Sequence, residues 1–351
     1  MRDTKEHREP ALPVFRTLLL LLAALVMTVG LTPRALAADT AQSEEARYVI
    51  PLGQAVGIKL FSQGVLVVGL SDGTNQGHPS PAKACGLEEG DIITHMNGTP
   101  VSSIEQVQAV LRQLNDPALT LTVLRADQTL SISTQAVRGS GGVWQLGAWI
   151  RDSMAGIGTL TFVEPATGLF GTLGHGINDV DTAVLMKLQS GAITPATVAS
   201  VVKGTDGRPG ELRGVFSSRE ELGDLYANTE QGVFGHLDNT GAFTGRAVPT
   251  AKAQEIHRGQ ATILANVSGD TVEEYTVEIQ KVNENAPDTR DMMLKVTDQR
   301  LLTKTGGIVQ GMSGSPILQD GKLIGAVTHV LVNDPTKGYG IFIEHMLDAA
   351  E

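Results

Sequence analysis

The sequence predicts a mainly β protein with more than one domain. Its 351 residues include 40 glycines and 15 prolines, and few stretches show the apolar repeat of a long amphipathic helix. Short apolar runs bounded by glycine-rich and polar turns are typical of strands. A chain of this length can also form two domains, each with its own buried core.

The charge and the cysteine content exclude several classes of function. The formal net charge is −11, which argues against binding to nucleic acid and against electrostatic attachment to anionic lipid. The single Cys85 cannot form an intramolecular disulfide, and its setting between Ala84 and Gly86 favours a small, buried, apolar role. We therefore expect neither thiol catalysis, nor a metal site, nor a cofactor.

The N-terminus has the pattern of an export signal. Basic residues precede an apolar run from Leu18 to Leu31, and Ala35-Leu36-Ala37 then resembles a cleavage site. The apolar run is short for a stable membrane span. We expect residues 1–37 to be a signal peptide or membrane anchor that directs export across the cytoplasmic membrane, and whether the segment is removed stays open. The polar, acidic residues 38–47 are predicted to be an exposed linker.

Residues 48–137 are predicted to form the first folded domain. The segment 85–93 continues into Met96-Asn97-Gly98 as a strand and turn, residues 103–114 have apolar side chains on one helical face, and residues 119–123 alternate like a strand. This pattern resembles a PDZ domain. The resemblance implies peptide binding by strand addition, and packing without a ligand is the alternative. The peptide-binding residues that it implies are Gly53, Gln54, Ala55, Val56, Gly57 and Ile58.

The segment Gly-Met-Ser-Gly-Ser-Pro at residues 311–316 is the strongest functional signal. It precedes an apolar strand that continues to Thr328. The small residues let backbone N–H groups converge near the hydroxyl of Ser313 and leave room for a substrate carbonyl. The pattern resembles the nucleophile loop of chymotrypsin-like serine proteases. An ordinary turn between two strands is the alternative.

His175 is the candidate general base. It lies between Gly174 and Gly176, just past the apolar run 157–162, and a serine nucleophile needs an imidazole oriented by a carboxylate or carbonyl. Histidine before serine is the chymotrypsin order. Among the other histidines, His329 is the best rival, although its strand position suits a residue that lines the cleft. The remaining histidines are His7, His78, His95, His236, His257 and His345.

Asp298 is the candidate third member of a catalytic triad. It ends an alternating strand-like segment 15 residues before Ser313, so it lies on the limb that enters the nucleophile loop. Asp179 and Asp181 are nearer to His175 in sequence, but loop carboxylates so close to a residue usually make local turns.

Residues 301–340 strongly resemble the SpoIVB peptidase family, the stage IV sporulation protein B serine proteases of endospore-forming bacteria. Further matching segments are residues 48–54, residues 150–159 and the pair Gly174-His175. The resemblance implies that residues 138–351 form a chymotrypsin-like double β-barrel peptidase. It also implies a triad of His175, Ser313 and Asp298, with the backbone N–H groups of Gly311 and Ser313 as the oxyanion hole. The substrate backbone is expected to pair with Thr328, His329 and Val330.

The same resemblance implies a biological role. These proteases process their own N-terminal part and cleave a membrane-bound sporulation regulator in the space between forespore and mother cell. That cleavage releases an intramembrane protease that matures a late sigma factor. Two alternatives are a non-catalytic PDZ scaffold that binds C-terminal peptides and an envelope quality-control protease of the HtrA type.

Overall fold

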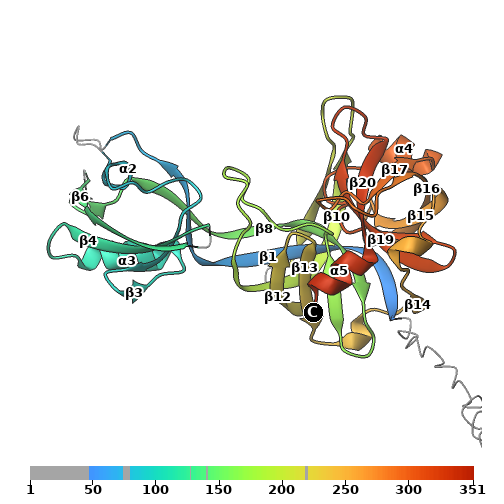
Figure 1. The fold of residues 1–351 in the computed structure, drawn as a ribbon, viewed down its shortest axis with the longest axis horizontal. Coiled ribbons are helices and arrows are strands. Elements are labelled where there is room, and N and C mark those ends of the chain that lie inside the picture. Colours follow the sequence, from blue (N-terminus) through green and yellow to red (C-terminus); the bar gives the residue numbers. More distant parts are fainter. Residues whose placement is uncertain (1–46, 74–79, 127, 140, 218–219) are drawn as a thin grey trace, which may run out of the picture. The chain divides into compact units, whose positions relative to one another are not determined.

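The computed structural model describes residues 47–73, 80–126, 128–139, 141–217 and 220–351. The predicted signal or anchor segment and the linker up to residue 46 lie outside these residues. Strands dominate the described chain (Figure 1), so the prediction of a mainly β protein is confirmed. In this described part, no helix is long and apolar enough to cross a membrane.

The predicted PDZ domain contains a sheet in the order β1-β2-β4-β5, with β3 paired to β2. Its helix α3 begins at a cap, where the Ser103 side chain accepts a hydrogen bond from the Gln106 N–H. Val107 and Leu111 on α3 pack against buried strand residues such as Leu121. The elements are the second half of β1 (Tyr48–Leu70), α2 (Pro81–Ala84), β2 (Ile92–Met96), β3 (Thr99–Pro100), α3 (Ile104–Gln113), β4 (Ala118–Arg125), β5 (Gln128–Gln135), β6 (Val137–Arg138) and β7 (Trp144–Gln145).

The first half of the predicted peptidase domain is a closed ring of strands. Successive pairings run β1-β8-β9-β13-β12-β10, and β10 pairs back to β1. Phe170, Ile193 and Val233 are among the buried residues that fill this ring. Its elements, besides β1, are β8 (Ala148–Val163), β9 (Leu169–Thr172), β10 (Leu188–Val202), β12 (Gly223–Thr229) and β13 (Gly232–Leu237), with β11 (Glu211–Phe216) on β10 and β14 (Val248–Pro249) on β1.

The second half is a closed barrel in the order β15-β16-β17-β20-β19-β18. Tyr275, Leu294, Ile317 and Phe342 are fully buried in its core. Together the two closed units confirm the predicted double β-barrel. The elements are β15 (Gly259–Asn266), β16 (Val272–Val282), β17 (Met292–Val296), β18 (Pro316–Gln319), β19 (Lys322–Val330), β20 (Lys337–Phe342), α4 (Gln299–Thr305), α5 (Ile343–Ala349) and the 3-10 helices η1 (Thr240–Ala242) and η2 (Ala253–Glu255).

Strands β1 and β8 belong to both domains. Up to the pair Phe61–Ser153 they are neighbours in the peptidase ring, and from the pair Leu66–Arg151 onward they lie in the sheet that includes the PDZ strands. The PDZ domain is therefore inserted between two strands of the first barrel. The boundary predicted at residue 48 is corrected, because one continuous apolar strand serves both sheets and the sequence shows no break within it.

Candidate active site

A cavity of about 410 Å³ lies where residues of both barrels meet. Its wall includes His175, Ser313 and Gly311, together with the three β19 residues Thr328, His329 and Val330. The structure therefore brings together all but one of the peptidase residues singled out from the sequence. The exception is Asp298, which does not line the cavity.

His175 follows β9 through a tight turn. Leu173 and Gly174 both have positive φ angles, of 69° and 68°, and a Cβ at Gly174 would lie 2.9 Å from a side-chain carbon of Ile341, so a larger residue does not fit there. The Nδ1 atom of His175 is 2.8 Å from the carbonyl oxygen of Gly176. Since a carbonyl only accepts, Nδ1 is the protonated nitrogen and Nε2 keeps its lone pair.

The protonation state of His175 suits a general base. Its ring is half-buried, and burial lowers the pKa of the imidazole, although the hydrogen bond to the Gly176 carbonyl opposes this shift. The neutral form therefore dominates at neutral pH. A neutral imidazole with a free Nε2 can accept a proton from a hydroxyl.

Ser313 lies in a loop that only glycine permits. Gly311 and Gly314 both have φ of 95°, and a Cβ on Gly314 would lie 2.1 Å from the Thr159 carbonyl oxygen. The Ser313 hydroxyl donates to the carbonyl oxygen of Thr328 over 2.6 Å. In this resting arrangement the hydroxyl is engaged by β19, so its side chain must rotate to meet the His175 ring on the same cavity.

Two backbone N–H groups beside the nucleophile are free. The N–H groups of Met312 and Gly314 donate to the carbonyls of Val309 and Val327. Those of Gly311 and Ser313 have no acceptor among the described residues, as a site for a developing oxyanion requires.

Thr159 of β8 fixes the nucleophile loop, a role that the sequence reasoning missed. Its hydroxyl donates to the Gly311 carbonyl over 2.8 Å, and its N–H donates to the Ser313 carbonyl over 3.2 Å. The available signal was its place at the end of the matching segment 150–159.

His329 lies beside the candidate base. The two ring centroids are 5.1 Å apart, with the rings tilted by 36°. Loss of hydration, the neighbouring His175 and Arg290 lower the pKa of His329 to about 4. As expected from its strand position, His329 lines the cleft.

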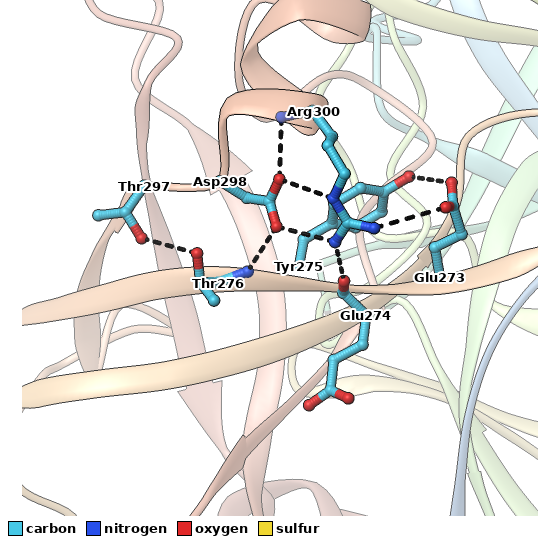
Figure 2. A network of polar contacts seen from close by, with 7 residues as sticks. All are labelled: Glu273, Glu274, Tyr275, Thr276, Thr297, Asp298 and Arg300. Atoms are coloured by element: carbon cyan, nitrogen blue, oxygen red, sulfur yellow. Dashed lines mark hydrogen bonds and ion pairs between the residues drawn. The ribbon is translucent and has the colours of Figure 1, made fainter.

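Asp298 takes part in a different network, which Figure 2 shows. It caps α4 by accepting from the Arg300 N–H over 2.9 Å, forms an ion pair with the Arg300 side chain and accepts from the Thr276 N–H. The Arg300 side chain lowers the pKa of this carboxyl to about 2. No hydrogen bond joins Asp298 to His175 in the described residues, so the structure does not place it as the third triad member.

The other two candidate carboxylates are also engaged elsewhere. Asp179 accepts from the N–H groups of Asp181 and Thr182 in a local turn, and both Asp179 and Asp181 pair with Arg151. Within the described chain, the orienting partner of His175 is thus the Gly176 carbonyl. No group of three or more His, Cys, Asp or Glu side chains in these residues could hold a metal ion.

The residues assigned to the PDZ peptide-binding loop lie in the peptidase ring instead. Residues 54–58 of β1 pair with β8 on one side, and from Val56 onward with β10 on the other. A Cβ on Gly53 would lie 2.6 Å from the Leu264 carbonyl oxygen, so this glycine permits close contact with β15. Strand addition is blocked from Val56 to Ile58, where both edges are paired. Since Gly53, Gln54 and Ala55 lie on the same strand of the ring, the assignment of Gly53, Gln54, Ala55, Val56, Gly57 and Ile58 to a PDZ peptide site is corrected.

Comparison with known proteins gives matches to two families. The SpoIVB peptidase S55 family matches residues 142–347, more than half of the chain, and the PDZ domain family matches residues 74–125. Over 76 residues the chain is 34% identical to a Synechocystis protein named serine protease HhoA. This match covers 21% of the chain and only 18% of that relative's length.

Two solved serine proteases also resemble the chain. The thermostable protease AL20 from an extremophilic microorganism is 12% identical with a TM-score of 0.32, over 57% of this chain and 89% of that one. The active form of the Rv3671c protease of M. tuberculosis is 13% identical with a TM-score of 0.30, over 57% of this chain and 75% of that one.

Proposed function

The chain belongs to the SpoIVB peptidase S55 family of serine peptidases, and on that premise we propose that it is an exported endopeptidase. Its substrates are its own N-terminal segment and a membrane-bound regulatory protein of sporulation. The single observation that supports catalysis is the meeting of His175, Ser313 and two free backbone N–H groups at one cavity. The export pattern of residues 1–37 supports a site of action outside the cytoplasmic membrane, and the family resemblance is the ground for proposing the space between forespore and mother cell.

The proposed chemistry is acyl transfer by a histidine–serine pair. A substrate N–H that binds the Thr328 carbonyl displaces the Ser313 hydroxyl, which then turns toward Nε2 of His175. His175 takes the hydroxyl proton as Oγ attacks the scissile carbonyl carbon, and the N–H groups of Gly311 and Ser313 bind the oxyanion. The same proton passes to the leaving amine.

The second half of the cycle regenerates the enzyme. A water molecule enters, His175 removes its proton, and the hydroxide attacks the acyl carbon. The proton returns to Ser313 Oγ when the acyl–oxygen bond breaks. Loss of one oxyanion donor costs about a hundredfold or more in kcat, so the geometry of the loop contributes to the rate in addition to the side chains of His175 and Ser313.

Replacement of the nucleophile tests the proposal. Ser313→Ala in the full chain should abolish labelling by a serine-reactive phosphonate and abolish trimming of the N-terminal segment. The matched control is Ser315→Ala, because Ser315 is in the same loop but is fully buried and its hydroxyl has no partner in the described structure. The control should be labelled like the wild type. Continued trimming by purified Ser313→Ala would exclude this residue as nucleophile.

The same experiment separates the competing function. A PDZ scaffold with an inert peptidase fold would bind C-terminal peptides and give no labelling of the wild type. Labelling that depends on Ser313 therefore excludes the scaffold.

A further inference from the structure

Strand β8 has an unpaired edge beside the candidate catalytic residues. Residues 153–158 of β8 pair with β1, whereas β9 pairs with β8 only from Leu160 to Val163. No other backbone partner of residues 154–157 occurs among the described residues. These four residues line the cavity that holds His175 and Ser313.

A second open edge faces the same cavity. The pairing of β19 with β18 ends at Ala326, while Val330 still pairs with β20 on the other side. Residues 328–330 therefore line the cavity with one edge unoccupied by a strand of the described chain. An extended peptide can add to open strand edges through its backbone, with alternate side chains in pockets.

Gly156 leaves open space beside the β8 edge. A Cβ built on Gly156 meets nothing within 4 Å, although the residue lies on the cavity wall. Ile58 is its direct partner across the strand pair, so the Ile58 side chain is on the same face. Met154 and Gly158 share that face because side chains alternate along a strand. A Cβ on Gly158 would already contact Leu173 and Ile58, so the free space is specific to position 156.

The residues around this open space are apolar and uncharged. Its neighbours on this face are Met154, Ile58 and Leu173, and none of the described residues that line the whole cavity is Asp, Glu, Lys or Arg. A charged side chain placed there would lose its hydration without gaining a partner. An apolar side chain would instead replace water against apolar walls.

We propose that residues 154–157 of β8 form a substrate-binding edge, and that the missing side chain at Gly156 creates a subsite for one uncharged, apolar residue of an extended peptide. The inference rests on the proposed peptidase function and names the substrate class of that site. Gly156 is thereby a specificity-determining residue, which the sequence reasoning did not single out.

Gly156→Val tests the subsite. The new side chain fits the structure without a clash, but it occupies the space that a bulky substrate side chain would need. The wild type and the variant digest an unbiased peptide library, and mass spectrometry identifies the residues around each cut. We expect one position of the wild-type profile to favour Val, Leu, Ile, Met or Phe and to exclude charged residues. In the variant that position should shift to Gly and Ala, with about a tenfold or larger loss in kcat/KM for bulky residues.

Two controls distinguish the possible failures. Gly141→Val also adds a side chain with nothing within 4 Å, but Gly141 lies outside the cavity, so its cleavage profile should match the wild type. A small serine-reactive organophosphate should label Ser313 equally in all three proteins. Gly156→Ala, which adds one methyl group, should give a partial shift if the valine variant folds poorly.

Equal labelling with an unchanged cleavage profile in Gly156→Val and Gly156→Ala would overturn the subsite while the peptidase function stands. Absence of labelling in the wild type would overturn both.

Discussion

At the scale of single residues, the site depends on which nitrogen of His175 carries the proton. The Gly176 carbonyl fixes the proton on Nδ1, so Nε2 is the nitrogen that remains free to accept a proton. A carboxylate in this position would also stabilise the imidazolium that forms during reaction. A carbonyl orients the ring as well but adds no full charge, so the base is weaker here than in a triad.

The pH dependence of hydrolysis follows from the buried imidazole. Burial lowers the pKa of His175, and only the neutral ring accepts a proton. Activity should therefore be complete above this pKa and lost as the pH falls through it, with a midpoint below the ordinary value of about 6.5. The measurement is kcat/KM between about pH 5 and about pH 8 with a peptide substrate. A midpoint above about pH 7 would indicate a carboxylate partner that raises the pKa instead.

Asp298→Asn separates a structural carboxylate from a catalytic one. Asparagine also caps helices, so the variant should lose less than about 1 kcal/mol of stability and less than about tenfold in kcat. Loss of the aspartate of a working triad costs about 10⁴ in kcat by comparison. Thermal unfolding and peptide hydrolysis measure the two effects. A loss of that larger size with an unchanged melting temperature would mean that Asp298 moves to His175 when substrate binds.

At the scale of elements, the nucleophile loop is held against strands of the first barrel. The Thr159 carbonyl accepts from the Leu173 N–H and from the Thr172 hydroxyl, while its N–H and hydroxyl bind the loop. Gly314 lies directly on this junction, with no room for a Cβ. Strand β8 therefore connects the histidine and serine segments, which come from different barrels.

Gly314→Ala should disturb this junction and abolish labelling of Ser313. The added methyl group would overlap the Thr159 carbonyl and the Leu173 N–H, and the positive φ angle adds about 1 kcal/mol or more of strain. The matched control is Gly321→Ala, which has a positive φ of 78° but open space around its Cβ. Both variants should melt at lower temperature, and only the control should keep wild-type labelling. Equal labelling of both would mean that the loop tolerates displacement from β8.

At the scale of the whole molecule, the peptidase domain contains an inserted module. The ring pairings of β1 with β8 and β10 end near Phe61 and Ser153, and residues 65–135 supply most of the PDZ sheet. The two strands that leave the ring are already antiparallel neighbours, so a short turn could join them.

Replacement of residues 62–152 by Asn-Gly, a favoured two-residue hairpin turn between the paired residues Phe61 and Ser153, should leave a folded peptidase that reacts with the phosphonate. Its melting temperature should fall, because Leu60 and Met186 lose their packing against Leu66 and Ile92. Circular dichroism and labelling provide the measurement, and the same deletion with Ser313→Ala is the unlabelled control. A soluble, folded but unlabelled product would show that the PDZ domain is needed to form the site.

The sequence predicted those parts of the site whose geometry is local. Glycines around Ser313 and His175 mark positions where the backbone itself requires glycine, and such patterns are visible within a few residues. Asp298 was misjudged because the pattern around it does not show which group its carboxylate will bind. In the fold its partner is Arg300, only two residues away, and not the distant His175. The residues around Gly53 were misassigned for a related reason, since a long apolar strand fits a PDZ sheet and a barrel equally well. Thr159 acts only through contacts with residues far along the chain.

The shared strands also fix an order of events during synthesis. The barrel part of β1 leaves the ribosome first, yet its partner β8 follows only after residues 62–152, a delay of about 5 to 20 seconds at usual elongation rates. The PDZ strands β2, β4 and β5 emerge within that interval and can pair with one another and with the end of β1. The inserted module is thus complete before the barrel around it can close, and the nascent chain exposes the apolar residues of β1 throughout this wait.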